Sequence, residues 1–359
     1  MISVCIITKN ESENLRKCLT SVSNYPVEIV VVDTGSIDNS IEVAKEFTSN
    51  VYTFDWCDDF SAARNYAASV APTDIILALD TDEYIEEADF EKAEELLTSD
   101  PNAAGRILRR DAFYQDEETM VCSTKISRLY SRKTSSYEGK IHEQISAKAH
   151  IDIPITIFHT GYLISEEEKN KKATRNLALL IDELKTNFPD YNNPVNYSDD
   201  DLLKLGYLTF QIGKAYYFTK DYADAYNWFE YTLSLGLDSS VSFVEETVNT
   251  FIYSAIKTGK ASDAEFVIAY YEVYCHSADF LLALGLLYMN LTKFDTAIET
   301  FNEATTCHTH SIEGANSYLA YYNAGVIEEC LGNITNAIKY YKQSLPYKKA
   351  KDRLLFISK

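Results

Sequence analysis

Two carboxylates stand one residue apart in the segment Leu79-Asp80-Thr81-Asp82-Glu83. The apolar run at residues 74–79, directly before them, predicts a buried strand. Two acids placed in this way can share one divalent cation. Their hard oxygen ligands suit Mg²⁺ or Mn²⁺, which would also bridge the phosphates of a nucleotide. Acid pairs of this kind also occur in solvated loops, so it is the position at a strand end that favours a ligand site.

A second acid closes another apolar run, at residues 27–32, in the turn Asp33-Thr34-Gly35-Ser36. The Asp33 carboxylate can accept hydrogen bonds from a nucleobase or a ribose. Gly35 permits a tight turn, and the helix N-terminus that follows favours anions. The alternative interpretation is a capped strand-to-helix turn that binds no ligand.

A dense polar and aromatic stretch at residues 56–65 leads into a helix expected at residues 60–70. Arg64 lies in its first turns, where it can pair with a phosphate or with one of the acids, and the spacing does not decide between them. Further along, basic residues between 106 and 133 stand out on an acidic chain. Arg128 is the candidate among them for contact with a phosphate.

Strands and helices alternate over the first 85 residues. The expected strands lie at residues 3–8, 27–32, 51–54 and 74–79, and the expected helices at residues 11–22, 41–47 and 60–70. Continuous apolar strands between amphipathic helices predict a parallel sheet with helices on both faces, whose ligands gather at the carboxyl ends of the strands. The second half of this domain is expected to contain short strands at residues 106–109, 124–130, 141–146 and 155–158.

The sequence repeats itself beyond residue 200. One spacing of glycine, alanine and an aromatic residue recurs in Gly213, Ala225 and Phe229, in Gly285, Ala297 and Phe301, and in Gly325, Ala337 and Tyr341. Each copy is long enough for two antiparallel helices, and the pattern resembles the tetratricopeptide repeat. A charged helix and a polar stretch at residues 190–201, which follows Pro189 and contains Pro194, are expected to connect these repeats to the first domain.

The motifs of the first domain resemble, in order and spacing, family 2 glycosyltransferases of the GT-A fold. The matching segments are Thr8-Lys9-Asn10-Glu11, the Asp33 turn, residues 58–65 and the acid pair. Together with the repeats, the arrangement resembles bacterial enzymes that glycosylate bacteriocin precursor peptides, including cysteine S-glycosyltransferases of the sublancin type. The resemblance implies a GT-A domain at residues 1–165, a connecting helix and linker at 166–200, and a helical repeat domain at 201–359.

The resemblance also implies roles for individual residues. A nucleotide-sugar donor, UDP-linked by preference, would contact Thr8, Asn10, Glu11, Asp33, Gly35, Arg64, Asp80 and Arg128. Asp80 and Asp82 match the aspartates that hold the metal and the donor diphosphate, with Asp82 the direct ligand, and His159 matches a late metal-binding histidine. Glu143 matches the catalytic carboxylate on the acceptor side. An inverting transfer needs only one such base, because the acceptor attacks the anomeric carbon directly.

Composition restricts the partners and the compartment. The formal net charge of −21 argues against binding to nucleic acid or to an anionic membrane surface. The seven scattered cysteines contain no CxxC pair, which favours reduced thiols in the cytoplasm. No apolar run approaches the roughly 20 residues that span a bilayer, and the apolar N-terminus is expected to be a strand.

The repeats suggest the acceptor. Stacked helix pairs present a curved surface that suits a peptide or protein, and 27 tyrosines could supply contact area there or at a homodimer interface. Two alternatives remain open at this point. The acceptor can be a cell-surface glycan or lipid intermediate, or the chain can be a non-catalytic repeat scaffold that binds nucleotide.

Overall fold

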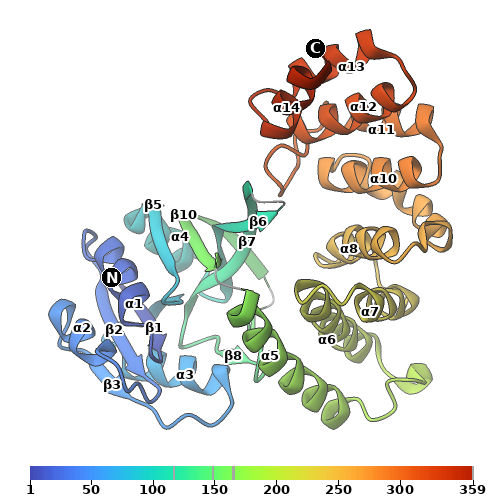
Figure 1. The fold of residues 1–359 in the computed structure, drawn as a ribbon. Coiled ribbons are helices and arrows are strands. Elements are labelled where there is room, and N and C mark those ends of the chain that lie inside the picture. Colours follow the sequence, from blue (N-terminus) through green and yellow to red (C-terminus); the bar gives the residue numbers. More distant parts are fainter. Residues whose placement is uncertain (116–117, 148, 164–165, 358–359) are drawn as a thin grey trace. The chain divides into compact units, whose positions relative to one another are not determined.

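The computed structural model describes residues 1–115, 118–147, 149–163 and 166–357. It divides into two compact units, Met1–Ser165 and Glu166–Lys359 (Figure 1). All seven cysteines are free thiols. Within the described residues, no helix combines the length and the apolar character needed to cross a membrane.

The first unit is built on an eight-stranded sheet with the order β3-β2-β1-β4-β7-β6-β10-β5. Its parallel half consists of β1 (Ile2–Thr8), β2 (Glu28–Asp33), β3 (Val51–Thr53) and β4 (Ile75–Leu79). Thr8 pairs with Asp33 at the ends of β1 and β2, and β1 also pairs in parallel with β4. The predicted parallel arrangement is therefore confirmed, and the carboxyl ends of these strands meet at one edge.

The other half of the sheet is mixed. It contains β5 (Glu83–Ala88), β6 (Ala103–Gln115), β7 (Glu118–Ser131) and β10 (Ala149–Tyr162). β7 runs antiparallel to β4 and β6, whereas β10 runs parallel to β6 and antiparallel to β5. Beside this sheet, the short strands β8 (Tyr137–Glu138) and β9 (Gln144–Ile145) form a hairpin.

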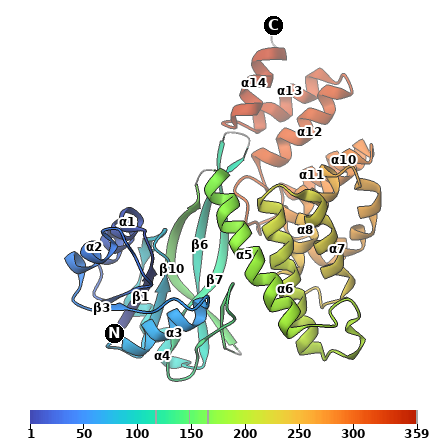
Figure 2. The same cartoon turned by 60° about the horizontal axis from the view of Figure 1, so that its bottom comes forward.

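The prediction of short strands in this half was wrong, because β6, β7 and β10 are 13, 14 and 14 residues long (Figure 2). Their apolar pattern is interrupted by charges that pair across the sheet. Arg106 on β6 and Lys125 on β7 both bind Asp152 on β10. Such charges resemble loop residues in the sequence alone. Residues 141–146 also differ from the prediction, since only Gln144–Ile145 is a strand.

Helices cover both faces of the sheet, as predicted. They are α1 (Ser12–Val22), α2 (Ser40–Phe47), α3 (Phe60–Val70) and α4 (Phe90–Ser99). Side chains alternate between the faces along a strand. Val4 and Ile6 of β1 therefore lie in one core cluster with α1, α2 and α4, whereas Cys5 lies in another with α3.

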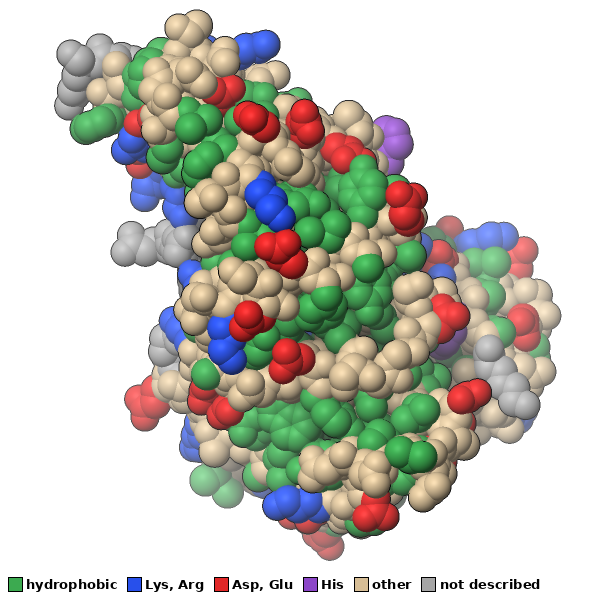
Figure 3. Space-filling view, turned by 90° about the vertical axis from the view of Figure 1, so that its right-hand side faces the viewer, with side chains coloured by type: hydrophobic (Ala, Val, Ile, Leu, Met, Phe, Trp, Pro, Cys, Tyr) green, Lys and Arg blue, Asp and Glu red, His purple; other side chains and the backbone are tan. Residues whose placement is uncertain are grey.

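The second unit consists of helices packed in sequence. They are α5 (Glu166–Asn187), α6 (Asp199–Phe218), α7 (Tyr222–Ser234), α8 (Val244–Lys257), α9 (Tyr271–Tyr274), α10 (Ala278–Asn290), α11 (Phe294–Ala304), α12 (Tyr318–Cys330), α13 (Ile334–Gln343) and α14 (Lys348–Ile357), with 3₁₀ segments at Pro194–Asn196 and Ala261–Tyr270. α5 packs against α6 within this unit. On the face shown in Figure 3, apolar side chains are interspersed with scattered acidic ones.

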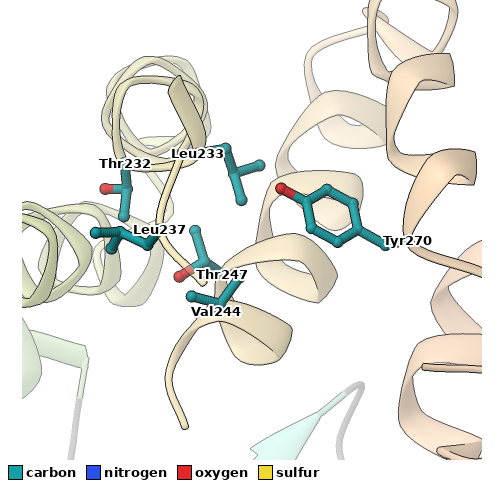
Figure 4. Close-up of a pocket in the computed structure, with 6 residues that line it drawn as sticks. All are labelled: Thr232, Leu233, Leu237, Val244, Thr247 and Tyr270. Carbon is teal, nitrogen blue, oxygen red and sulfur yellow. The ribbon is translucent and has the colours of Figure 1, made fainter. Parts of the chain in front are cut away.

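The recurring spacing of glycine and an aromatic residue has a steric origin. A Cβ atom added to Gly213 would lie 2.6 Å from Phe229, and one added to Gly285 would lie 2.5 Å from Phe301. Each glycine lets two helices of a pair approach across an aromatic ring. The gap in Figure 4, lined by Tyr270 and by side chains of α7, α8 and the segment between them, is too narrow for a water molecule and is a feature of packing.

Candidate active site

A chain of acidic and basic side chains lies beyond the carboxyl end of β4. This ion-pair network consists of Glu143, Arg64, Asp80, Arg128, Glu83, Arg109, Asp111, His159 and Asp82. Its members come from α3, β5, β6, β7, β10, the loop after β4 and the β8–β9 hairpin. Five carboxylates face three guanidinium groups and one imidazole, so the network has an excess of acidic groups.

Asp80 is the centre of one half of the network. Arg64 Nη2 donates to Asp80 Oδ1 at 2.6 Å, and Arg128 Nη2 donates to Asp80 Oδ2 at 2.7 Å. Burial disfavours the charged form of Asp80, but the two guanidinium groups outweigh this effect and hold its pKa well below the usual range. Because both oxygens of Asp80 accept hydrogen bonds from arginine, its place as a metal ligand remains a prediction.

Glu83 connects the two halves from a fully buried position. Its Oε1 accepts a hydrogen bond from Arg128 at 2.9 Å and lies 3.7 Å from Arg109 Nη1, while its Oε2 accepts the backbone N–H of Asp80 at 3.0 Å. Arg109 Nε in turn lies 2.9 Å from Asp111 Oδ1. A buried carboxylate requires such partners, since its desolvation is otherwise costly.

His159 and Asp82 form the end of the network opposite Glu143. His159 Nδ1 lies 2.6 Å from Asp111 Oδ1, and its Nε2 lies 3.6 Å from Asp82 Oδ1. Burial lowers the pKa of His159, but the carboxylates of Asp111 and Asp82 outweigh burial and raise that pKa to about 9. The Asp111 carboxylate orients the imidazole through Nδ1, as carboxylates behind metal-binding histidines do.

The position of Gly161 bears on whether Asp82 and His159 can hold a cation. A Cβ atom at this position would lie 2.4 Å from both Asp82 Oδ2 and His159 Nε2. The absence of a side chain at Gly161 therefore lets Asp82 and His159 converge against the backbone, which fits a metal held by these two residues together with donor oxygens. Within the described residues, no group of three or more His, Cys, Asp or Glu side chains is placed to hold a metal ion.

The predicted donor-binding residues near the N-terminus lie at the same edge of the sheet. The Asp33 carboxylate accepts the backbone N–H groups of Gly35 and Ser36 at 3.0 Å each. Asn10 Oδ1 accepts the N–H of Ile37 at 2.8 Å and so joins the end of β1 to this turn. β1 lies between β2 and β4, and this edge therefore carries both the Asp33 turn and the acid pair.

Thr8 and Glu11 also lie at this edge. The Thr8 hydroxyl is buried and has no hydrogen-bond partner in the described part of the chain. The Glu11 backbone N–H donates to Ser40, and its carboxylate accepts from Asn14 at 2.7 Å. The structure thus gathers Thr8, Asn10 and Glu11 beside Asp33, and their contact with a donor remains a prediction.

α3 holds the hairpin that carries Glu143. Asn65 Nδ2 donates to the Tyr137 carbonyl and Asn65 Oδ1 accepts the Tyr137 N–H, both at 2.9 Å. The Phe60 N–H donates to the Lys140 carbonyl at 2.9 Å. Phe60 and Asn65 therefore anchor this hairpin to α3. Asp59 accepts the Ala62 N–H and caps the helix.

Sequence reasoning did not select Glu83, Asp111, Asn65 or Gly161 as site residues. Glu83 follows the acid pair directly, and its position beside a strand end was a usable signal. Asp111 lies inside the long strand β6. Only the pairing of β6 with β10 brings it opposite His159. No local pattern could have identified it.

Gly161→Ala is expected to weaken binding of Mn²⁺ with UDP by at least about tenfold, because the added methyl group would overlap Asp82 and His159. Isothermal titration of UDP with and without Mn²⁺ measures this effect. The melting temperature of the variant serves as its folding control. Unchanged Mn²⁺-dependent binding in a folded variant would contradict a metal position between these two side chains.

Comparison with known proteins identifies the two parts of the chain. The profile of glycosyl transferase family 2 matches residues 3–151, and the tetratricopeptide repeat profile matches residues 278–306 and 318–350. Among solved structures, S. aureus TarS aligns with 73% of this chain and 53% of its own at 13% identity, with a TM-score of 0.37.

Several relatives carry the same domain. A TPR repeat-containing protein of Synechococcus elongatus is 34% identical over 145 residues, which are 40% of this chain and 35% of the relative. An uncharacterized glycosyltransferase of Rickettsia prowazekii is 30% identical over 39% of this chain and 50% of its own. The SPbeta prophage-derived glycosyltransferase SunS of Bacillus subtilis is 27% identical over 50% of this chain and 44% of its own. The chain thus spans a third to a half of these relatives. Residues 3–151 match glycosyl transferase family 2, and matches to the tetratricopeptide repeat follow them in the same chain.

Proposed function

We propose that this protein transfers a sugar from a nucleotide sugar, UDP-linked by preference, to a side chain of a peptide or protein, with inversion at the anomeric carbon. The observation that carries the proposal is the ion-pair network at the donor edge of a family 2 domain. One of its ends has the Asp82–His159 pair and the other has Glu143. These ends supply the two groups that an inverting transfer requires, a site for the leaving diphosphate and a base.

The donor side is formed by the ends of β1, β2 and β4. Asp33 would contact the nucleobase or the ribose of the donor. Thr8, Asn10 and Glu11 line the same edge of the sheet. Mg²⁺ or Mn²⁺, held by Asp82 and His159, would supply positive charge that stabilises the leaving diphosphate. Asp111 orients His159 for that task.

Glu143 is the base of the proposed reaction. It removes the proton from the acceptor nucleophile while that atom forms its bond to the anomeric carbon and the bond to the diphosphate breaks. The side chain of Glu143 is 11% exposed, so it is largely shielded from bulk water yet open at one side. Its hairpin is held by α3, which keeps the carboxylate at a defined place.

The second unit supports a polypeptide acceptor. Its helices α5 and α6 border an open hollow of about 500 Å³, lined by Leu177, Ala178, Ile181, Lys185 and Tyr216 among others. Apolar side chains with a few polar groups suit an extended or helical peptide better than a single sugar. The similarity to SunS agrees with the resemblance of this domain arrangement to peptide glycosyltransferases. A cysteine of a bacteriocin precursor is therefore our first choice of acceptor.

The experiment is a transfer assay with the full chain. UDP-glucose or UDP-N-acetylglucosamine is incubated with Mn²⁺ and with synthetic peptides that contain Cys, Ser or Asn. Intact mass spectrometry detects addition of a hexose or of an N-acetylhexosamine, respectively. Small open reading frames beside the gene supply further acceptor candidates. Transfer to a peptide supports the proposal. Turnover with glycan or lipid acceptors only, or binding of UDP without any turnover, would refute the peptide assignment.

Removal of the second unit is expected to weaken binding of the acceptor and to leave binding of the donor unchanged. A chain that ends after residue 165 should bind UDP with Mn²⁺ like the full chain, because the donor residues lie in the first unit. Its apparent affinity for the acceptor should fall by at least about tenfold. Steady-state kinetics with varied acceptor measure this. If a folded truncated chain modifies its acceptor as efficiently as the full chain, the repeats serve another partner.

A further inference from the structure

Arg64 is the link between the proposed base and the acid pair. Its Nε donates to Glu143 Oε1 at 2.5 Å, and its Nη2 donates to Asp80 Oδ1 at 2.6 Å. One guanidinium group thus holds two carboxylates that are 63 positions apart in the sequence. Two charge-assisted hydrogen bonds from one planar group define the positions of both acids relative to each other.

The surroundings of Arg64 make this arrangement rigid. The side chain is 6% exposed, whereas Asp80 is 33% exposed. The guanidinium carbon lies 5.3 Å from the centre of the Tyr137 ring, which belongs to the same hairpin as Glu143. The neighbouring Asn65 binds the backbone of Tyr137. α3 therefore holds this hairpin at its backbone, at an aromatic ring and at the Glu143 carboxylate.

These contacts favour one of the two roles considered for Arg64. An arginine that binds a donor phosphate must present its guanidinium group to the ligand. Arg64 is nearly buried, and two of its nitrogens are used by carboxylates. Arg128 also binds Asp80, but its second carboxylate partner is Glu83.

We propose that Arg64 is a positioning residue, which holds Glu143 in place for proton removal and ties it to the acid pair through Asp80. This inference rests on the proposed function, because Glu143 must act as the base for its position to matter. In the absence of Arg64, the largely buried Glu143 would lose its cationic partner and its fixed orientation. The rate at saturation should then fall, and donor binding should persist.

The first measurement is the division of the effect between kcat and KM. Arg64→Ala is expected to lower kcat for transfer by about 10- to 100-fold and to leave the KM for the donor within about twofold. Arg64→Lys keeps the charge but cannot make both bonds, and its kcat should lie between those of Arg64→Ala and the unaltered chain. Guanidinium ion, far below denaturing concentrations, should partly restore Arg64→Ala and not Arg64→Lys.

The second measurement is a double-mutant cycle with Glu143→Gln. If Arg64 acts through Glu143, Arg64→Ala should lower kcat by no more than about twofold in the Glu143→Gln background. Arg132→Ala is the matched control. Arg132 binds the carbonyls of Ala68 and Ala71 near the other end of α3, so its removal tests general disturbance of the helix. Its effect on kcat should be small and equal in both backgrounds.

Three outcomes of these measurements distinguish the possible roles of Arg64. A loss of kcat in Arg64→Ala that disappears in the Glu143→Gln background supports the proposal. An equal loss in both backgrounds, or a donor KM that rises tenfold or more in a folded variant, overturns it and makes Arg64 a donor-binding residue. If the unaltered chain shows no transfer with any acceptor, the proposed function fails instead. This result is distinguishable from a failure of the Arg64 proposal, because it is obtained without any substitution.

Discussion

Asp82→Ala is expected to reduce sugar transfer by on the order of a thousandfold or more, because it removes the carboxylate that faces His159 and leaves the diphosphate charge without its metal. Excess chelator should have the same effect on the unaltered chain. The side chain of Asp82 is 18% exposed and lies against the backbone of Gly161. Its substitution should therefore disturb the fold little.

Titration of UDP with and without Mn²⁺, followed by the transfer assay, measures this expectation. Glu87→Ala is the matched control, since Glu87 is an exposed carboxylate on β5, the strand that follows the acid pair. It should retain the activity of the unaltered chain. Full transfer by Asp82→Ala, or by the unaltered chain in excess chelator, would rule out a metal-assisted mechanism at this site.

Glu143→Gln is expected to slow transfer by at least about a hundredfold, because glutamine keeps the shape of the side chain but cannot accept the proton of the acceptor. Binding of UDP with Mn²⁺ should remain unchanged, since the metal pair lies at the other end of the ion-pair network. Steady-state kinetics with varied donor and varied acceptor separate these effects. The melting temperature controls for the loss of the ion pair with Arg64.

Two other outcomes would be informative. If donor affinity collapses while the rate at saturation survives, Glu143 is a binding residue and its assignment as base is wrong. Glu143→Gln could also slow transfer to a cysteine peptide by much less than a hundredfold while it abolishes transfer to a serine peptide. This difference would indicate that the natural acceptor is a thiol. A thiol loses its proton more readily than a hydroxyl and depends less on a base.

Local patterns in the sequence were sufficient for the parallel half of the fold and for the repeats. The apolar run before Asp80 predicted a buried strand, and β4 ends at Leu79. The recurring glycine and aromatic spacing predicted helix pairs, and Gly213 does face Phe229. These features depend on residues close together in the chain, whose periodicity survives in the sequence.

The candidate site was predictable only in part. Asp33 is the last residue of β2, and the acid pair comes directly after β4. Their position at one edge is therefore a consequence of the parallel order of β2, β1 and β4. Glu143 and His159 were selected through a family resemblance and not through any local pattern. The structure brings His159 within 3.6 Å of Asp82, and it connects Glu143 to Asp80 through Arg64.

Only the tertiary structure decided how these charges are paired. Arg64 could have met a phosphate or an acid, and it meets two acids, one of them 79 positions away. Asp111 lies beyond the strand expected at residues 106–109, yet β6 places it opposite His159 of β10. An ion pair is formed by whichever side chains a sheet and its loops bring together in a poorly hydrated space. Its partners are therefore determined by strand order and register, which the spacing of residues along the chain does not contain.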